Sequence, residues 1–221
     1  RRVLFRSIRR QMVPGQDQGQ SPLKLGFGMT AIKILDFNEE TDVISLYGWN
    51  KMGWKDINLQ WDPKDYDGIS TLRMPSSLMW RPDMVLYNSL TLGSNQDESV
   101  MAVVQSNGDV LFIPPAISKI TCNPISEDDE DDNDDSSKDH HHHDLNHPEW
   151  KCRFKFGSWV YDGEMVELQL YGDETKIDLS DFKKDKKYEV VSTNAKVNAK
   201  VYDCCPEKYY DVTMTMHIRR K

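Results

Sequence analysis

The chain has 221 residues (25.7 kDa) and carries 28 basic and 36 acidic residues, a formal net charge of −8. This length is enough for one or two domains with a sizeable core. The acidic balance argues against a nucleic-acid partner, and no apolar run approaches the roughly 20 residues that span a bilayer, so we expect no membrane insertion of this chain.

The N-terminal segment predicts one helix, over residues 2–13. Apolar residues recur at helical spacing between arginines from Val3 to Met12, and Pro14-Gly15 ends the pattern. Residues 1–6 are too charged for the apolar centre of a secretory signal peptide. We therefore expect any secreted protein to be present here in mature or truncated form.

The pattern then changes to strands. From Leu23 the chain alternates, first at Leu25, Phe27, Met29 and Ala31, and after a slip at Ile32, Ile34 and Leu35. A turn follows at residues 38–41. The further candidate strands are 43–49, 59–61, 84–86, 100–105, 110–114, 153–161, 166–171, 188–201 and 212–219. Nine or more short strands separated by turn signals predict an all-β sandwich.

One turn is marked clearly by its sequence. The pair Asn107-Gly108 lies between two candidate strands. Asn and Gly tolerate positive φ angles, and this pair is typical of a tight β-hairpin. We therefore predict a hairpin in which both residues supply positive φ.

The acidity of the chain is local. From Glu127 to Glu149 there are eleven Asp or Glu residues and one Lys, which leaves 27 basic and 25 acidic residues for the rest. Like charges repel one another, so such a run stays solvated and cannot bury an apolar face. We predict a long surface loop inside a folded domain, since strand-like sequence resumes at Trp150.

Several sequence blocks resemble one family. Residues 80–88 (WRPDMVLYN) resemble the W-x-P-D-x-x-x-Y-N block of Cys-loop receptor ligand-binding domains, and residues 156–163 (FGSWVYDG) resemble its F-G-S-W-x-Y-x-G block. Residues 202–209 (YDCCPEKY) resemble the vicinal-cysteine loop of nicotinic acetylcholine receptor α subunits and acetylcholine-binding proteins. Residues 49–54 and 59–61 are similar to the strand on the opposite subunit face. The blocks follow the family order over nearly the whole chain.

The resemblance implies one domain over residues 1–221: a ten-strand, immunoglobulin-like β-sandwich with an N-terminal α-helix, assembled as a homopentameric ring. It also implies a ligand site between neighbouring subunits, with the lysine-rich segment 176–187 beside it. The principal face would contribute Tyr87, Trp159, Tyr202, Cys204, Cys205 and Tyr209. The complementary face would contribute Trp49, Lys51, Met101, Val103, Leu111 and Ile113.

Aromatic rings at these positions suit a small cationic amine. A quaternary ammonium has no N–H to donate, and ring faces stabilise it by roughly 0.5–2 kcal/mol each, most strongly when desolvated. The residues alone also fit another interpretation, because most Trp and Tyr side chains of an average protein are simply buried. The family resemblance favours the ligand site, with Trp159 and Tyr202 as its leading members.

The four cysteines allow two disulfides. Cys204 and Cys205 are adjacent, with Cα atoms about 3.8 Å apart, so a bond between them would form a tight ring; free thiols or intermolecular pairing are the alternatives. The resemblance implies a second bond, between Cys122 and Cys152. Disulfides need an oxidising compartment, which predicts a secreted or extracellular protein.

The segment between Cys122 and Cys152 departs from the family pattern. Residues 123–151 are acidic and rich in histidine, whereas the family's receptors carry a much shorter segment with a Phe-Pro-Phe-type tip that docks on the membrane domain. The departure favours a soluble binding protein over a channel. The segment also holds a candidate zinc, copper or nickel site, with a loose calcium site in its acidic run, or it is only a solvated charge run. The candidate ligands are His140, His141, His142, His143 and His147.

The leading hypothesis is a secreted, acetylcholine-binding-protein-like module that captures small cationic amines and needs no cofactor. No nucleophile–base arrangement is visible, so we expect no enzyme activity. One alternative is the extracellular domain of a pentameric ligand-gated channel, which four apolar segments of about 20 residues after Lys221 would establish. Another is an orphan β-sandwich with a different ligand and a metal-binding loop.

Overall fold

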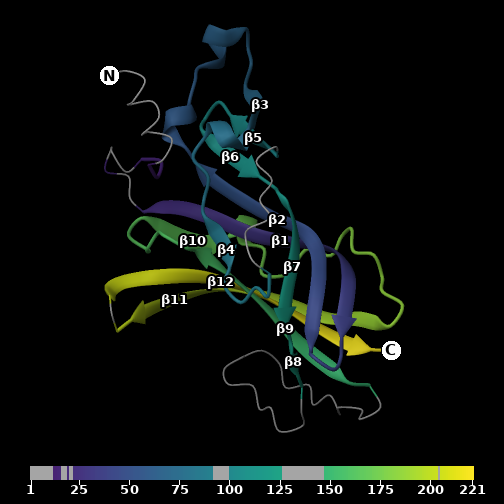
Figure 1. The fold of residues 1–221 in the computed structure, drawn as a ribbon. Helices are drawn as coiled ribbons and strands as arrows, with labels where there is room; N and C mark the ends of the chain where they lie inside the picture. Colours follow the sequence, from purple (N-terminus) through teal and green to yellow (C-terminus); the bar gives the residue numbers. More distant parts are fainter. Residues whose placement is uncertain (1–11, 16–18, 20–21, 92–99, 126–146, 204) are drawn as a thin grey trace.

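The computed structural model describes residues 12–15, 19, 22–91, 100–125, 147–203 and 205–221. Two layers of β-sheet make up the molecule, and the chain ends at the lower right of Figure 1 beside the turn that joins β1 to β2. Most of the predicted N-terminal helix, residues 2–11, lies outside the described residues. Met12 and Val13 are described and are not helical, so the predicted helix does not extend to Val13.

The described residues form twelve strands in two sheets. One sheet has the order β10-β1-β2-β6-β5-β3, with β7 also paired to β2, and the other has the order β11-β12-β9-β4, with β8 also paired to β9. All pairs are antiparallel except β1 with β10. The strands are β1 (Leu23–Asn38), β2 (Val43–Lys55), β3 (Thr71–Pro75), β4 (Met84–Leu86), β5 (Met101–Gln105), β6 (Asp109–Phe112), β7 (Pro115–Thr121), β8 (Asn123–Pro124), β9 (Glu149–Ser158), β10 (Val166–Leu170), β11 (Tyr188–Tyr202) and β12 (Cys205–Arg220). The predicted all-β sandwich is confirmed, with twelve described strands instead of ten.

The core lies between the sheets and follows the predicted alternation. The residues of the first parity of β1, Leu25 to Ala31, are buried, and the pairing of β1 with β2 shifts twice after Ala31. These bulges carry Ile34 into the core and turn Leu35 outward, where it is 48% exposed. Phe27 of one sheet meets Phe156 of the other with ring centroids 4.7 Å apart. Sheet-to-sheet contacts of this kind hold the sandwich together.

The predicted strand at residues 59–61 is wrong. Residues Ile57–Leu59 form a short 3₁₀ helix, η2, because the Asp56 carboxylate accepts a hydrogen bond of 2.9 Å from the backbone N–H of Asn58. Trp61 then donates its indole N–H to the carbonyl oxygen of Ile69 at 2.6 Å. Capping and side-chain hydrogen bonds therefore replace a sheet ladder here.

The predicted hairpin turn forms with a different backbone conformation. The Gly108 N–H donates to the Gln105 carbonyl oxygen at 2.8 Å, and Gly108 has φ +89°, whereas Asn107 has negative φ. Asn107 instead accepts a hydrogen bond of 3.0 Å from the Asp109 N–H through its side-chain oxygen. The hairpin is thus a turn followed by one left-handed glycine, the common three-residue solution.

Strands β3, β7 and β8 were not predicted. Each contains or borders a proline, which reads as a loop signal in the sequence. Proline is tolerated at the first position of a strand, as Pro115 shows in β7. In the described part of the chain, every helix is too short or too polar to span a bilayer.

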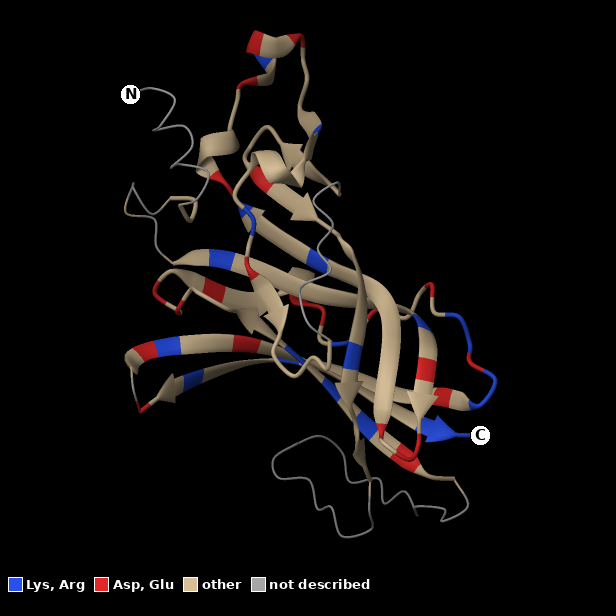
Figure 2. Ribbon diagram, viewed as in Figure 1, with Lys and Arg blue, Asp and Glu red and all other residues tan. Residues whose placement is uncertain are grey.

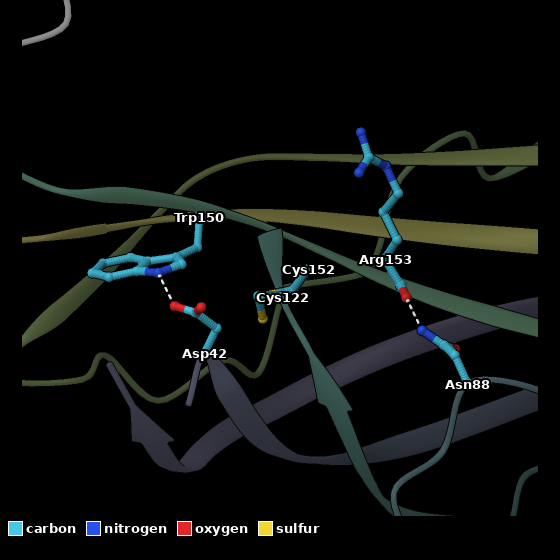
Figure 3. The surroundings of a disulfide bond; sticks show 6 residues. All are labelled: Asp42, Asn88, Cys122, Trp150, Cys152 and Arg153. Carbon is cyan, nitrogen blue, oxygen red and sulfur yellow. Dashed lines mark hydrogen bonds between the residues drawn. A yellow bond between two sulfur atoms is a disulfide. The ribbon is translucent and has the colours of Figure 1, made fainter. Parts of the chain in front are cut away.

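The predicted disulfide Cys122–Cys152 is confirmed and links the two sheets. Cys122 follows β7, and Cys152 lies in β9 (Figure 3). The turn between β1 and β2 is tied to the same place, because Asp42 accepts a hydrogen bond of 2.8 Å from the Trp150 indole and its carbonyl accepts one of 2.7 Å from the Cys122 N–H. Three segments that are distant in the sequence therefore meet at this bond.

Candidate functional site

The four predicted principal-face aromatic residues lie on neighbouring strands of one sheet. Tyr87 directly follows β4, Trp159 directly follows β9, Tyr202 ends β11 and Tyr209 lies in β12. The ring centroids of Tyr87 and Trp159 are 6.4 Å apart, and those of Tyr202 and Tyr209 are 5.7 Å apart with the rings nearly perpendicular. Such spacings are ordinary for aromatic pairs. The sheet order thus gathers residues that are up to 122 positions apart in the sequence.

Tyr87 is held by its hydroxyl and by a glycine. The hydroxyl donates a hydrogen bond of 2.5 Å to the Ser158 carbonyl oxygen. A Cβ at Gly157 would lie 2.3 Å from that hydroxyl, so only glycine leaves room for the ring. Burial raises the pKa of Tyr87 to about 12, and the neighbouring Tyr202, Asp211 and Asp83 add to the shift. The phenol therefore stays neutral at physiological pH.

Asp83 fixes the backbone on both sides of Trp159. Its carboxylate accepts hydrogen bonds of 2.6 Å from the Ser158 hydroxyl and 2.7 Å from the Val160 N–H. The Ser158 oxygen in turn accepts the Tyr161 N–H at 2.8 Å. Yet the Trp159 side chain is 74% exposed. A large apolar ring is thus presented to solvent on a rigid support, an arrangement typical of a binding surface.

The tip of the β11–β12 hairpin carries the two remaining tyrosines. The Lys200 ammonium lies 4.8 Å from the centroid of the Tyr202 ring, so this ring face already receives a cation within the chain. Tyr202 pairs with Cys205, which is disulfide-bonded. Cys204, its predicted partner, lies outside the described residues.

A buried carboxylate, that of Asp211, links β12 to the neighbouring strands β11 and β9. Asp211 is almost fully buried and accepts a hydrogen bond of 2.7 Å from the Asn198 amide, while the Lys155 ammonium lies 3.2 Å from its other oxygen. A buried carboxylate is tolerated only when it is paired in this way. Asp83, Lys155, Lys200 and Asp211 were not predicted as part of the site; only Asp83 lies in a recognised sequence block, and its spacing does not reveal its hydrogen bonds.

The predicted complementary residues lie on the other sheet. Trp49 and Lys51 occupy one face of β2, because Leu46 and Met52 of opposite parity are buried. Val103 of β5 pairs with Leu111 of β6, while Met101 and Ile113 are exposed at the edge of this face. Of these six residues, Val103 and Leu111 line a groove of about 440 Å³, together with Gly53 and Tyr171 among others. The two predicted half-sites therefore belong to different sheets of one chain.

The lysine-rich segment has two parts. Asp178, near its start, contacts Lys51 on β2, and so does Glu174, which precedes the segment. Its later lysines lie near the C-terminus, where the Lys221 ammonium donates a hydrogen bond of 2.7 Å to the Asp185 carbonyl oxygen. Figure 2 shows basic residues gathered on this segment and on the end of β12. Only the first part therefore borders the complementary residues.

Comparison with known proteins identifies the family. A model of the neurotransmitter-gated ion-channel ligand binding domain matches residues 2–125 and 148–221. The chain belongs to this family. Its members are ligand-binding domains rather than enzymes, in agreement with the predicted lack of enzyme activity. The match omits 126–147, which is most of the acidic and histidine-rich segment.

Relatives of the ligand-binding domain include nicotinic receptor subunits. The chain is 33% identical to the acetylcholine receptor subunit alpha-type acr-16 of Caenorhabditis briggsae, over 90% of this chain and 36% of that protein. It is 32% identical to the chicken (Gallus gallus) neuronal acetylcholine receptor subunit alpha-2, over 88% and 33% respectively. The chain thus spans about a third of the length of the curated relatives it matches.

A solved structure shares the fold of this ligand-binding domain. It is an acetylcholine-binding protein of Capitella teleta in complex with lobeline, with a TM-score of 0.79 and 24% sequence identity. The match covers 99% of this chain and 93% of that one. At this identity the likeness establishes the two-sheet sandwich and its topology.

The predicted metal site falls mostly outside the structure. His140, His141, His142 and His143 lie outside the described residues. His147 is described and exposed, with Nδ1 3.2 Å from the Arg220 carbonyl oxygen. Among the residues with described positions, no three His, Cys, Asp or Glu side chains gather as metal ligands.

Proposed function

We propose that this domain binds small cationic amines, of the acetylcholine or alkaloid type, between neighbouring copies of itself in a ring of five. The principal half-site consists of Tyr87, Trp159, Tyr202, Tyr209 and the Cys204–Cys205 pair. The complementary half-site of the neighbour consists of Trp49, Lys51, Met101, Val103, Leu111 and Ile113. We further propose that the domain works outside the cell, because its Cys122–Cys152 disulfide needs an oxidising compartment.

The observation that carries the proposal is the exposed indole of Trp159 on its fixed backbone. Tyr87 lies beside it as a neutral phenol, so this second ring adds a cation–π face without adding a charge. Several such rings around one ammonium support micromolar affinity or better. A second sheet face from a neighbour would supply Trp49 and exclude water, which strengthens every cation–π contact.

A second candidate function is the extracellular domain of a ligand-gated channel. It is favoured by the relatives, which are receptor subunits about three times as long as the matched region. Here binding at the same site would drive loop closure and pore opening. The full-length transcript discriminates between the candidates, since four apolar segments of about 20 residues after Lys221 would establish the channel.

The proposal is tested by titrating the purified domain with acetylcholine, nicotine and lobeline while tryptophan emission is recorded. We expect saturable quenching by at least one of the amines at micromolar concentration. Light scattering should give about 128 kDa, five times the 25.7 kDa of one chain. A folded ring whose emission is unchanged up to millimolar amine would contradict amine binding, and a monomer at micromolar concentration would contradict the shared site.

A further inference from the structure

A groove of about 380 Å³ lies between two segments that do not pair with each other. One consists of residues 33–37, in the last part of β1, and the other of residues 184–188, which lead into β11; together they supply every residue that lines the groove. Beyond Ile32, no described strand pairs with the edge of β1 that faces away from β2. Among the described residues, no backbone hydrogen bond joins the two segments. The groove therefore lies along an open strand edge.

Contacts between the flanking residues close both ends of this groove. At one end the Lys183 N–H donates a hydrogen bond of 2.7 Å to the Ile32 carbonyl oxygen. At the other end the rings of Phe37 and Tyr188 meet edge to face, with their centroids 5.1 Å apart. The five residues of β1 between these contacts span about 16 Å. The groove thus has a fixed length that suits a small ligand better than a long polymer.

The C-terminal end of the chain holds the outer side of the groove. Lys221 donates its N–H to the Lys187 carbonyl oxygen at 2.8 Å and its ammonium to the Asp185 carbonyl oxygen at 2.7 Å. The Asp185 carboxylate accepts the N–H groups of Lys187 and Tyr188 at 2.7 Å and 3.0 Å. In the described part of the chain, the backbone N–H groups of residues 184–186 donate to no protein acceptor. These donors are left to water or to a ligand.

Lysines dominate the charge of the groove. Four lysines and two carboxylates line it, a net charge of +2: Lys33, Lys184, Lys186 and Lys187 against Asp36 and Asp185. Within the described residues, none of the four ammonium groups forms a salt bridge or a hydrogen bond, whereas Lys51 and Lys155 each meet a carboxylate. Figure 2 shows the basic residues of this segment beside the basic end of β12. Such a surface attracts anions.

Exposed lysines alone do not indicate a site, because most are simply solvated. A lysine beside an open strand edge also discourages pairing with another chain, and Lys33 fits that role. The groove differs from scattered surface lysines in two respects. Its cations come from both sides of a gap that is closed at its ends, and the buried side chains of Ile34, Phe37 and Tyr188 form its base. A ligand in the groove would meet positive charge on two sides and apolar surface below.

We propose that this groove binds a phosphate monoester, with the phosphate between the lysines of the two segments and the organic group against the apolar base. A phosphate monoester carries about −1.5 to −2 charges at pH 7 and three strong acceptor oxygens, which match a site rich in ammonium and N–H donors. The volume of about 380 Å³ falls within the range of ordinary ligand sites, roughly 300–1,000 Å³. The groove shares no residue with the proposed amine site, so the two proposals are independent.

The test measures the binding of phenyl phosphate to the intact domain by calorimetry at low salt, with phenyl sulfate as a monoanion of similar shape. Lys33→Gln removes a cation from one side of the groove and Lys186→Gln removes one from the other. Each change should weaken phenyl phosphate binding by about 5-fold, the effect of one charge pair at contact distance in water. Lys196→Gln is the matched control, because it removes the same charge about 26 Å along β11 from Tyr188, well beyond the Debye length.

A second arm separates the two sources of this chemistry, since the same group occurs in small soluble esters and in the headgroup of phosphatidic acid. Phosphatidylcholine vesicles with and without phosphatidic acid are sedimented with the domain. Sedimentation that requires phosphatidic acid and is lost in Lys33→Gln and Lys186→Gln would support the proposal and assign a lipid. Binding of phenyl phosphate alone, with the same dependence on the two lysines, would support it and assign a soluble ester.

Three results would overturn the proposal: no binding in either arm, equal affinity for phenyl phosphate and phenyl sulfate, or the same loss in Lys196→Gln as in the two groove variants. The last result would mean that only the overall charge of the domain matters. Thermal unfolding of each variant confirms that the fold is retained. Titration of the same variants with acetylcholine should give unchanged amine affinity, so failure of the groove leaves the proposed function standing.

Discussion

The hydroxyl of Tyr87 donates its hydrogen bond to the carbonyl of Ser158, the residue immediately before Trp159. The phenol of one proposed ligand-binding residue therefore positions the backbone of another. Gly157 makes this possible, because any side chain at that position would occupy the space of the Tyr87 ring. The geometry of the two rings therefore depends on Gly157, which is not among the proposed ligand-binding residues.

Gly157→Ala should accordingly displace the Tyr87 ring. Because the new Cβ would lie 2.3 Å from the hydroxyl, we expect an amine affinity at least about tenfold lower and a stability loss of about 1–3 kcal/mol. Fluorescence titration and urea unfolding measure the two effects. In a Tyr87→Ala background the same change should cost little further affinity, since the clash is gone. Additive losses would show that Gly157 acts through some other contact.

Trp159→Ala should separate binding from stability. The indole is 74% exposed, so its removal should change the free energy of unfolding by less than about 0.5 kcal/mol. Affinity for a quaternary amine should fall by about 2–4 kcal/mol, with a smaller loss for Trp159→Phe because a ring face remains. Calorimetric titration and thermal unfolding provide the two numbers. A large stability loss with unchanged affinity would make Trp159 a structural residue.

Replacing Cys122 and Cys152 by alanine should destabilise the sandwich strongly. The bond closes a loop with a sequence separation of 30, which corresponds to about 3.6 kcal/mol on the chain-entropy estimate. Urea unfolding should show a free energy of unfolding lower by this amount, and therefore a lower midpoint. Asp42→Ala removes the hydrogen bond from Trp150 and places alanine at a φ of 55°, so it should cost about 1–2 kcal/mol and serves as the comparison. Equal midpoints for all three proteins would contradict the prediction.

Acid should destabilise the end of the sandwich that holds Glu149. Burial lowers the pKa of His217, whose Nε2 lies 2.6 Å from the Glu149 carboxylate, and the pKa of Glu149 is lowered because its bond to Arg219 and the charges of His217 and Arg219 outweigh burial. A lowered pKa means that the unfolded state binds protons more readily, so stability is present at neutral pH and falls as the pH drops below about 6.5.

His217→Gln tests this pH dependence. The variant should lose the part of the acid destabilisation that begins below about pH 6.5 and keep the part below about pH 4.5, which belongs to Glu149. Urea unfolding at a series of pH values gives both curves. Curves of identical shape for the two proteins would mean that His217 does not titrate differently in the folded and unfolded states.

The local sequence pattern predicted most of the strands because burial imposes a period of two. The alternation from Leu25 to Ala31 is an example, and the slip after it corresponds to real bulges. The pattern failed at residues 59–61, where the Asp56 cap competes with sheet formation. It also failed at Pro115, since a proline that opens a strand looks the same in sequence as a proline in a loop.

The aromatic positions were predicted by family resemblance, whereas their supports were not. Asp83 lies 75 residues from Ser158, and Lys51 lies 123 residues from Glu174. Partners so far apart in sequence carry no local periodicity that would reveal their pairing. The pairing of Lys51 with Glu174 and Asp178 is therefore a property of the fold that the residue order does not reveal.

Strands β8 and β9 lie side by side, with Asn123 opposite Lys151 and Pro124 opposite Trp150, and the Ile125 N–H donates to the Glu149 carbonyl at 2.9 Å. These contacts hold the two ends of the intervening segment together in one short antiparallel ladder. Since loop-closure entropy rises only with the logarithm of length, residues added or deleted between these strands cost the fold little. This position is a natural graft point, where evolution or an engineer can exchange the inserted sequence while the ligand-binding face is inherited unchanged.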